Sequence, residues 1–171
     1  MKDITILSQS YTSFVIIDSL GNTIYNDYTT ANVAHKYSFY AEKNIRYFIK
    51  LNTNTSCSFN YSINSSNIYT AGTNNAITAY VNGRSTRVYS LTINTEGYYT
   101  FDTISSLDPY LTIYFGTNMI AYNDNSFILD EEGNEEFISD SHIYTYLAAG
   151  TYYLVLGNLS SRSGNITLTI K

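Results

Sequence analysis

The chain of 171 residues contains two histidines, His35 and His142, and each follows a similar tetrapeptide, "IYND" at 24–27 or "AYND" at 121–124. A histidine serves as a general base when a neighbour orients it and a substrate proton lies within reach. No "GxSxG" nucleophile motif occurs in the chain. Both histidines precede alternating aromatic residues, which favours a position at the start of a strand. We therefore predict no catalytic residue, and we interpret each "ND" pair as the cap of a turn.

Acidic side chains crowd together between residues 130 and 140, where they could bind a cation. Calcium takes roughly six to eight oxygen ligands, which carboxylates supply. The stretch "DEEGNEE" does not have the spacing of an EF-hand loop. Two interpretations therefore stay open, a solvated insertion loop and a calcium site. The predicted calcium ligands are Asp124, Asp130, Glu131, Glu132 and Asp140.

Tyrosine is unusually frequent, with 19 copies beside no tryptophan. A tyrosine on a sheet can pack its ring and keep its hydroxyl in water, and exposed tyrosines favour contacts with proteins and sugars. Successive residues of a strand point to opposite faces, so adjacent tyrosines cannot both be buried in one core. Ordinary sheet faces would also use such residues. We predict a contact surface on one sheet face, formed by Tyr144, Tyr146, Tyr152 and Tyr153.

The elements that must position these residues are strands. Apolar and polar residues alternate along nearly the whole chain, Gly- and Asn-rich turns separate the stretches, and no long helical periodicity occurs. This pattern predicts an all-β fold, a jelly-roll-like antiparallel β-sandwich in tandem units. The expected strands are 14–19, 36–41, 46–51, 58–63, 76–81, 87–93, 98–103, 110–115, 142–147, 151–157 and 165–170.

The chain contains an internal repeat. "SFVIIDSLGNTIYND" aligns with "YLTIYFGTNMIAYND", and the alignment continues by matching His35 with His142, Tyr47 with Tyr152 and Ile63 with Ile170. The repeat divides the chain into a partial unit, 1–65, and a complete unit, 66–171.

The first copy has nothing equivalent to residues 67–97, so it would lack its first strands. A sandwich without these strands has unpaired edges and a partly open core. Two explanations stay open: the chain is a piece of a longer protein, or another chain supplies the strands.

Composition narrows the functional classes. The net charge is −5, and no basic stripe occurs, so the chain is a poor candidate for binding nucleic acid. The single Cys57 excludes a disulfide within the chain, although an exposed thiol could form an intermolecular bridge. No apolar run reaches the length of a membrane span, and no signal peptide opens the chain.

Two stretches, "DPYLTIYFGTNMIAYNDN" and "IYTYLAAGTYYLVLGNLSSRSGNITLTI", resemble the bacterial pre-peptidase C-terminal domain family. The resemblance covers residues 98–170, and "YLAAGTYYLVL" is its most specific part. The first copy lacks the "AGTY" motif and is assigned only through the repeat. The family implies a jelly-roll-like sandwich that serves as a non-catalytic appendage of secreted bacterial proteins. It is similar in design to clostridial collagen-binding domains, and some such domains bind calcium or polymeric substrates.

We therefore expect a non-enzymatic module of an extracellular or cell-surface bacterial protein, with calcium as the one candidate cofactor. Its expected partner is an extracellular polymer, a protein fibre or a glycan, or another surface. The alternative is a structural subunit of a fibre, in which chains complete one another through the unpaired strands of the first unit.

Overall fold

The computed structural model describes residues 1–129, 132–133 and 135–171, in which the regular elements are β-strands. The chain divides into two compact units, Met1–Ser66 (unit 1) and Asn67–Lys171 (unit 2). Packed sheets form each unit, which confirms the predicted all-β sandwich class. Within the described ranges, no helix has the length and apolar character needed to cross a membrane.

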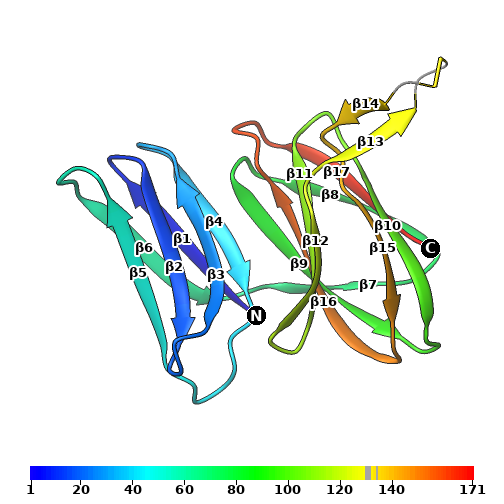
Figure 1. Ribbon diagram of the computed structural model, residues 1–171, viewed down its shortest axis with the longest axis horizontal. Coiled ribbons are helices and arrows are strands. Elements are labelled where there is room, and N and C mark those ends of the chain that lie inside the picture. The colour runs from blue at the N-terminus through cyan, green and yellow to red at the C-terminus, as the bar shows by residue number, and fades with distance from the viewer. Residues whose placement is uncertain (130–131, 134) are drawn as a thin grey trace. The chain divides into compact units, whose positions relative to one another are not determined.

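Unit 1 is a sandwich of two three-stranded antiparallel sheets (Figure 1). Its strands are β1 (Lys2–Ser8), β2 (Thr12–Asp18), β3 (Thr23–Thr29), β4 (Ala34–Phe39), β5 (Tyr47–Thr53) and β6 (Phe59–Ser65). The sheet orders are β4-β1-β6 and β3-β2-β5. Ile4 and Ile6 of β1 meet Phe14 and Ile16 of β2 in the core, because alternate residues of each strand face the opposite sheet.

Unit 2 is a larger sandwich, in which a four-stranded sheet, β15-β10-β17-β8, packs on a five-stranded sheet, β12-β11-β16-β9-β7. Its strands are β7 (Ile68–Ala71), β8 (Asn75–Val81), β9 (Ser85–Ile93), β10 (Gly97–Ile104), β11 (Pro109–Phe115), β12 (Asn118–Asn123), β13 (Ser126–Leu129), β14 (Glu135–Ile138), β15 (His142–Leu147), β16 (Gly150–Asn158) and β17 (Gly164–Ile170). Strands β13 and β14 form a separate hairpin. The pairing of β7 with β9 is parallel, which departs from the antiparallel expectation.

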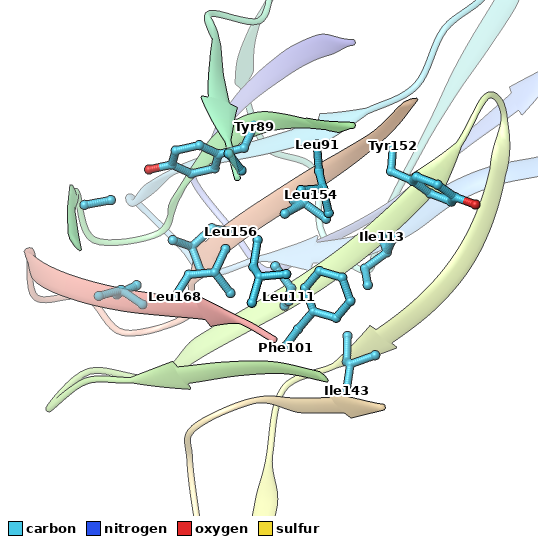
Figure 2. Packing of buried hydrophobic residues seen from close by; sticks show 14 of the residues in the cluster. Tyr89, Leu91, Phe101, Leu111, Ile113, Ile143, Tyr152, Leu154, Leu156 and Leu168 are labelled. Carbon is cyan, nitrogen blue, oxygen red and sulfur yellow. The ribbon is translucent and has the colours of Figure 1, made fainter. Parts of the chain in front are cut away.

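The core of unit 2 lies between these two sheets (Figure 2). Residues from β10, β15 and β17 meet residues from β9, β11 and β16, and most of them are fully buried. Figure 2 labels ten of them: Tyr89, Leu91, Phe101, Leu111, Ile113, Ile143, Tyr152, Leu154, Leu156 and Leu168. This layer fixes which face of each strand points outward.

The two units share a strand order. In unit 1 the sheets run β4-β1-β6 and β3-β2-β5, and in unit 2 the corresponding strands run β15-β10-β17 and β12-β11-β16. Unit 2 adds β8 beside β17, and β9 followed by β7 beside β16. The strands that unit 1 lacks are therefore the ones formed by residues 68–93 in unit 2.

The turn interpretation is wrong for the first "ND" pair, whereas the second pair lies where β12 ends and the connection to β13 begins. Asn26 and Asp27 lie inside β3, and Asn123 is the last residue of β12. The Asp27 carboxylate accepts hydrogen bonds from the Tyr25 hydroxyl at 2.9 Å and the Tyr28 N–H at 2.8 Å. These local bonds form within an extended strand, so polar side chains alone did not indicate a turn.

The alignment of His35 with His142 is also wrong. His35 pairs with Ile6, a core residue of unit 1, whereas His142 pairs with Asp102 on β10. His35 is buried and His142 is exposed. An offset of one residue moves a strand side chain to the opposite face of its sheet, which is the difference observed here.

Candidate functional site

Three tyrosines gather on the outer face of the four-stranded sheet of unit 2. Tyr144 and Tyr146 lie on β15, and Tyr98 lies on the neighbouring β10. The rings of Tyr98 and Tyr144 stack with centroids 5.1 Å apart and planes 12° apart, and the Tyr146 ring meets Tyr98 edge-on at 5.4 Å. Their exposed fractions are 65% for Tyr98, 63% for Tyr144 and 49% for Tyr146. We call these three residues the tyrosine platform.

The alternation of β15 explains this placement. Ile143 and Leu147 point into the core, so Tyr144 and Tyr146 between them point outward. The antiparallel register sets Tyr98 opposite Tyr146, which brings all three rings together. Such cross-strand aromatic pairs contribute about 0.2–1 kcal/mol to a sheet, so the cluster is partly preorganised before it meets a ligand.

The structure does not bring the four predicted tyrosines to one face. Tyr152 and Tyr153 lie on β16 of the other sheet. Tyr152 is only 4% exposed, its hydroxyl donates to the Ala148 carbonyl at 3.0 Å, and its ring contacts Phe115. Tyr152 therefore cannot belong to a contact surface, and sequence reasoning missed Tyr98, which only the register of β10 and β15 reveals.

Acidic and polar side chains lie beside the tyrosine platform. Partial burial, followed by a hydrogen bond with the Glu96 carboxylate, raises the pKa of Tyr146. Further along the same two strands, Nδ1 of His142 lies 2.7 Å from Oδ1 of Asp102. The face thus offers aromatic rings beside groups that can accept or donate hydrogen bonds.

A cleft of about 720 Å³ opens beyond the Asp102–His142 pair. Its wall combines polar side chains with the apolar Ile104 and Phe127, both of which are strongly exposed. Ser126 and Ser141 also line this cleft. The Ser126 hydroxyl donates to the Asp140 carbonyl at 2.7 Å, and the Ser141 hydroxyl lies 2.9 Å from the Asn123 carbonyl.

Both serine hydroxyls of the cleft are therefore engaged with backbone carbonyls rather than directed at His142. A serine nucleophile needs a base within hydrogen-bond reach. His35 is held differently, since its Nε2 lies 2.9 Å from the Thr30 hydroxyl and its Nδ1 lies 3.0 Å from the Tyr37 hydroxyl. These contacts tie β4, which holds both His35 and Tyr37, to the connection that follows β3, as expected for a histidine with a structural role.

The predicted calcium ligands fall only partly within the structure. Asp130 and Glu131 lie outside the described residues, whereas Asp124, Glu132 and Asp140 lie within them. Among the described residues, no three acidic, histidine or cysteine side chains group as a metal site would require. The Asp140 carboxylate accepts the Ser105 N–H at 2.9 Å, and burial raises its pKa. The calcium interpretation stays a prediction.

Comparison with known proteins supports the fold. No protein-family model and no curated protein matches the chain. The structure is similar to the pre-peptidase C-terminal domain of the collagenase from Bacillus anthracis, with a TM-score of 0.51 and 15% identity over 63% of this chain and 98% of that one. A more distant similarity, with a TM-score of 0.39 and 9% identity, involves CorA, a surface-associated copper-binding protein of Methylomicrobium album BG8. It covers 61% of this chain and 99% of that one.

The predicted resemblance to pre-peptidase C-terminal domains is thereby supported for the fold. The assignment of the first copy to that family stays a prediction.

Proposed function

We propose that the chain is a non-catalytic binding module of an extracellular or cell-surface protein, and that the tyrosine platform contacts a polymer, either a protein fibre or a glycan. The observation that carries the proposal is the stack of Tyr98, Tyr144 and Tyr146 on an open sheet face. Exposed aromatic rings in a rigid arrangement contribute much to binding at little entropic cost. The fold shared with a domain of a bacterial collagenase supports the same class of function and an extracellular location.

Co-sedimentation of the full chain with insoluble fibrous collagen, chitin and cellulose tests this proposal. We expect retention on at least one polymer, and at least a tenfold weaker apparent affinity for Tyr144→Ala and Tyr98→Ala, as for aromatic residues at the centre of interfaces. Tyr28→Ala is the matched control, because Tyr28 is an exposed tyrosine that stacks on Tyr11 in unit 1. Equal binding by the platform variants and the control would contradict the proposal.

A second candidate function is that of a structural subunit whose chains complete one another through unpaired strands. The observation that favours it is the exposure of apolar side chains along β6 of unit 1. Strand addition to an open sheet edge is a common mode of assembly. Sedimentation velocity of the purified chain over a wide concentration range tests it. Long polymers are the expected result, and a strict monomer would rule out self-assembly.

Calcium binding by the acidic stretch is a separate proposal. Its ligands would come from Asp124, Glu132 and Asp140 together with Asp130 and Glu131. A ligand that binds only the native state raises the melting temperature as its concentration increases. Thermal unfolding of the chain with and without millimolar calcium would measure this effect, and an unchanged melting temperature would dismiss the proposal.

A further inference from the structure

The outer face of β10 and β15 continues from the tyrosine platform to the cleft beyond the Asp102–His142 pair. Phe101 of β10 is buried in the core, so Tyr98 and Asp102 both lie on the outward face of that strand. On β15, His142 and Tyr144 share the outward face in the same way, and the register sets Asp102 opposite His142. Four residues of a strand span about 13 Å, which is the distance from the platform to the charged pair.

The corresponding face of unit 1 shows that the sandwich does not require exposed rings at this place. There β1 and β4 take the positions of β10 and β15, and Asp3, Lys36 and Ser38 are among their side chains that point away from the core. The Asp3 carboxylate accepts the Ser38 hydroxyl at 2.7 Å and lies 2.9 Å from the Lys36 ammonium. The tyrosines of unit 2 are therefore not explained by packing of the shared fold, which favours a role in binding.

Unit 2 carries an excess of negative charge. Residues 67–171 hold four Lys/Arg and ten Asp/Glu, which sum to −6. Glu96 borders the platform, Asp102 lies between the platform and the cleft, and Asp140 lines the cleft. Among the described residues, Lys171 is the one lysine or arginine that lines the cleft. The charge of this face therefore complements a basic partner.

The cleft combines apolar surface with carboxylates. Ile104 is 66% exposed and Phe127 is 64% exposed, and both line the cleft together with Asp102 and Asp140. An arginine or lysine side chain matches this lining, because its apolar stem covers hydrocarbon and its charged head bonds to carboxylates. A neutral glycan would leave the carboxylates without an opposite charge.

The tyrosine platform suits the same chemistry. Tyr98 and Tyr144 stack on each other, so each ring covers one face of the other and keeps its second face for a partner. A guanidinium stacks on such a face through cation–π attraction, and the Glu96 carboxylate, which bonds to the third tyrosine of the platform, would attract the same group. The chain contains a contact of this kind, in which Cζ of Arg87 lies 5.0 Å from the centroid of the Tyr69 ring.

We infer that the outer face of β10 and β15 binds a basic segment of another polypeptide in extended form, with one arginine or lysine on the tyrosine platform and a second in the cleft beside Asp102. This inference rests on the proposed binding function and specifies a protein partner rather than a glycan. Alternate residues of an extended chain point the same way, and four residues span about 13 Å. The two basic residues of the partner would therefore be four positions apart.

The test is an NMR titration of the isotope-labelled full chain with synthetic peptides of glycine, serine and arginine at about 0.15 M salt. In one peptide the arginines are four positions apart, and in a second peptide of the same composition they are adjacent. We expect saturable binding with shift changes in β10 and β15, and at least threefold higher affinity for the spaced peptide. Lysine in place of arginine should weaken binding a few-fold, because an ammonium lacks the planar stacking surface of a guanidinium. Shift mapping on the wild-type chain does not depend on the folding of any variant.

Protein variants locate the contacts. Asp102→Asn and Tyr98→Ala should each weaken binding of the spaced peptide at least fivefold. Lys171→Gln should strengthen it a few-fold, because this variant removes a like charge from the cleft. Glu42→Gln is the matched control, since it removes one negative charge from an exposed residue of unit 1, and it should change the affinity less than twofold.

Several outcomes would overturn the inference. Equal weakening by Asp102→Asn and Glu42→Gln, equal affinity for the two arginine peptides, or shift changes confined to unit 1 would show unspecific attraction between opposite charges. Absence of peptide binding would overturn it too. In that case, weaker retention of Tyr98→Ala on an insoluble polymer would leave the proposed binding function standing with another partner, and unchanged retention would refute both.

Discussion

At the scale of single residues, the backbone at Gly157 runs directly against a buried aromatic ring. A Cβ at this position would overlap the Tyr110 side chain, which is itself buried. We expect Gly157→Ala to lower the free energy of unfolding by about 1–3 kcal/mol, measured by urea denaturation. Gly97→Ala is the matched control, because a Cβ there would meet nothing within 4 Å. Similar losses for both variants would contradict the steric explanation.

Asp18 gives the turn between β2 and β3 a pH-dependent contact. Its Oδ1 accepts the N–H groups of Leu20 and Asn22, and its Oδ2 accepts the Asn22 side-chain amide at 2.8 Å. The Asn22 side-chain bond, aided by backbone N–H groups, lowers the pKa of Asp18 below its ordinary value. A carboxyl group whose pKa is lowered in the folded state stabilises the fold at pH values above its ordinary pKa. This stabilisation is lost as the pH falls through the lowered pKa of the folded state.

The expected outcome is that Asp18→Asn lowers the melting temperature at pH 7, and that its difference from wild type shrinks below about pH 4. Thermal unfolding from pH 7 to pH 2.5 measures both. A difference that stays constant over this range would show that the charge of Asp18 has no role.

At the scale of the strand, Ile63 and Ile170 make a matched pair at one register position in two environments. Ile170 is fully buried, so Ile170→Ala should lower the free energy of unfolding of unit 2 by about 2–5 kcal/mol. Ile63 is 46% exposed, so Ile63→Ala should lower that of unit 1 by less than about 1 kcal/mol. Hydrogen exchange of each unit separates the two effects, and equal costs would mean that Ile63 is covered in solution.

Alternation in the sequence predicted most strands that face a core, including the edge strands β4, β5, β6, β8 and β15, but it missed the edge strands β3, β7 and β12. β3, β7 and β12 end their sheets and expose many side chains on both faces, so they show no clear apolar alternation. The central strand β1 was missed as well, because it opens with the charged Lys2 and Asp3 and only Ile4 and Ile6 mark its core face. Whether such a segment forms an edge strand depends on its pairing with a strand that is distant in the sequence, and a local pattern does not show this pairing.

The sequence allowed only part of the candidate site to be predicted, because local alternation identifies outward residues in some strands and not in others. In β15, Ile143 and Leu147 alternate with Tyr144 and Tyr146, so the outward residues were recognisable. In β16, apolar residues occupy both faces, and Tyr152 turns inward because it alternates in phase with the core residues Leu154 and Leu156. The position of Tyr98 depends on the register between β10 and β15, which no local pattern specifies.

At the scale of the whole molecule, the two units differ in how much apolar surface they bury. Among the residues that the structure describes, the core of unit 1 contains six buried hydrophobic residues, whereas that of unit 2 contains eighteen. Smaller domains bury a smaller share of their surface and are less stable. We expect unit 1 to unfold first, with amides of β1 and β2 exchanging faster than those of β11 and β16 in native-state hydrogen exchange. Uniform protection and a single cooperative transition would contradict this order.

The position of β8 and β9 in the chain also has a consequence for biosynthesis. These strands are translated after unit 1 but before β16 and β17, with which they finally pair. At a synthesis rate of about 5–20 residues per second, this leaves β8 and β9 without these partners for several seconds. During that interval a nascent chain holds both of these unpaired strands and a synthesised unit 1, in which β5 and β6 end their sheets among the described residues. The ribosome-bound chain is therefore the stage at which mispairing between the repeats competes with correct folding, and at which a chaperone would have the most effect.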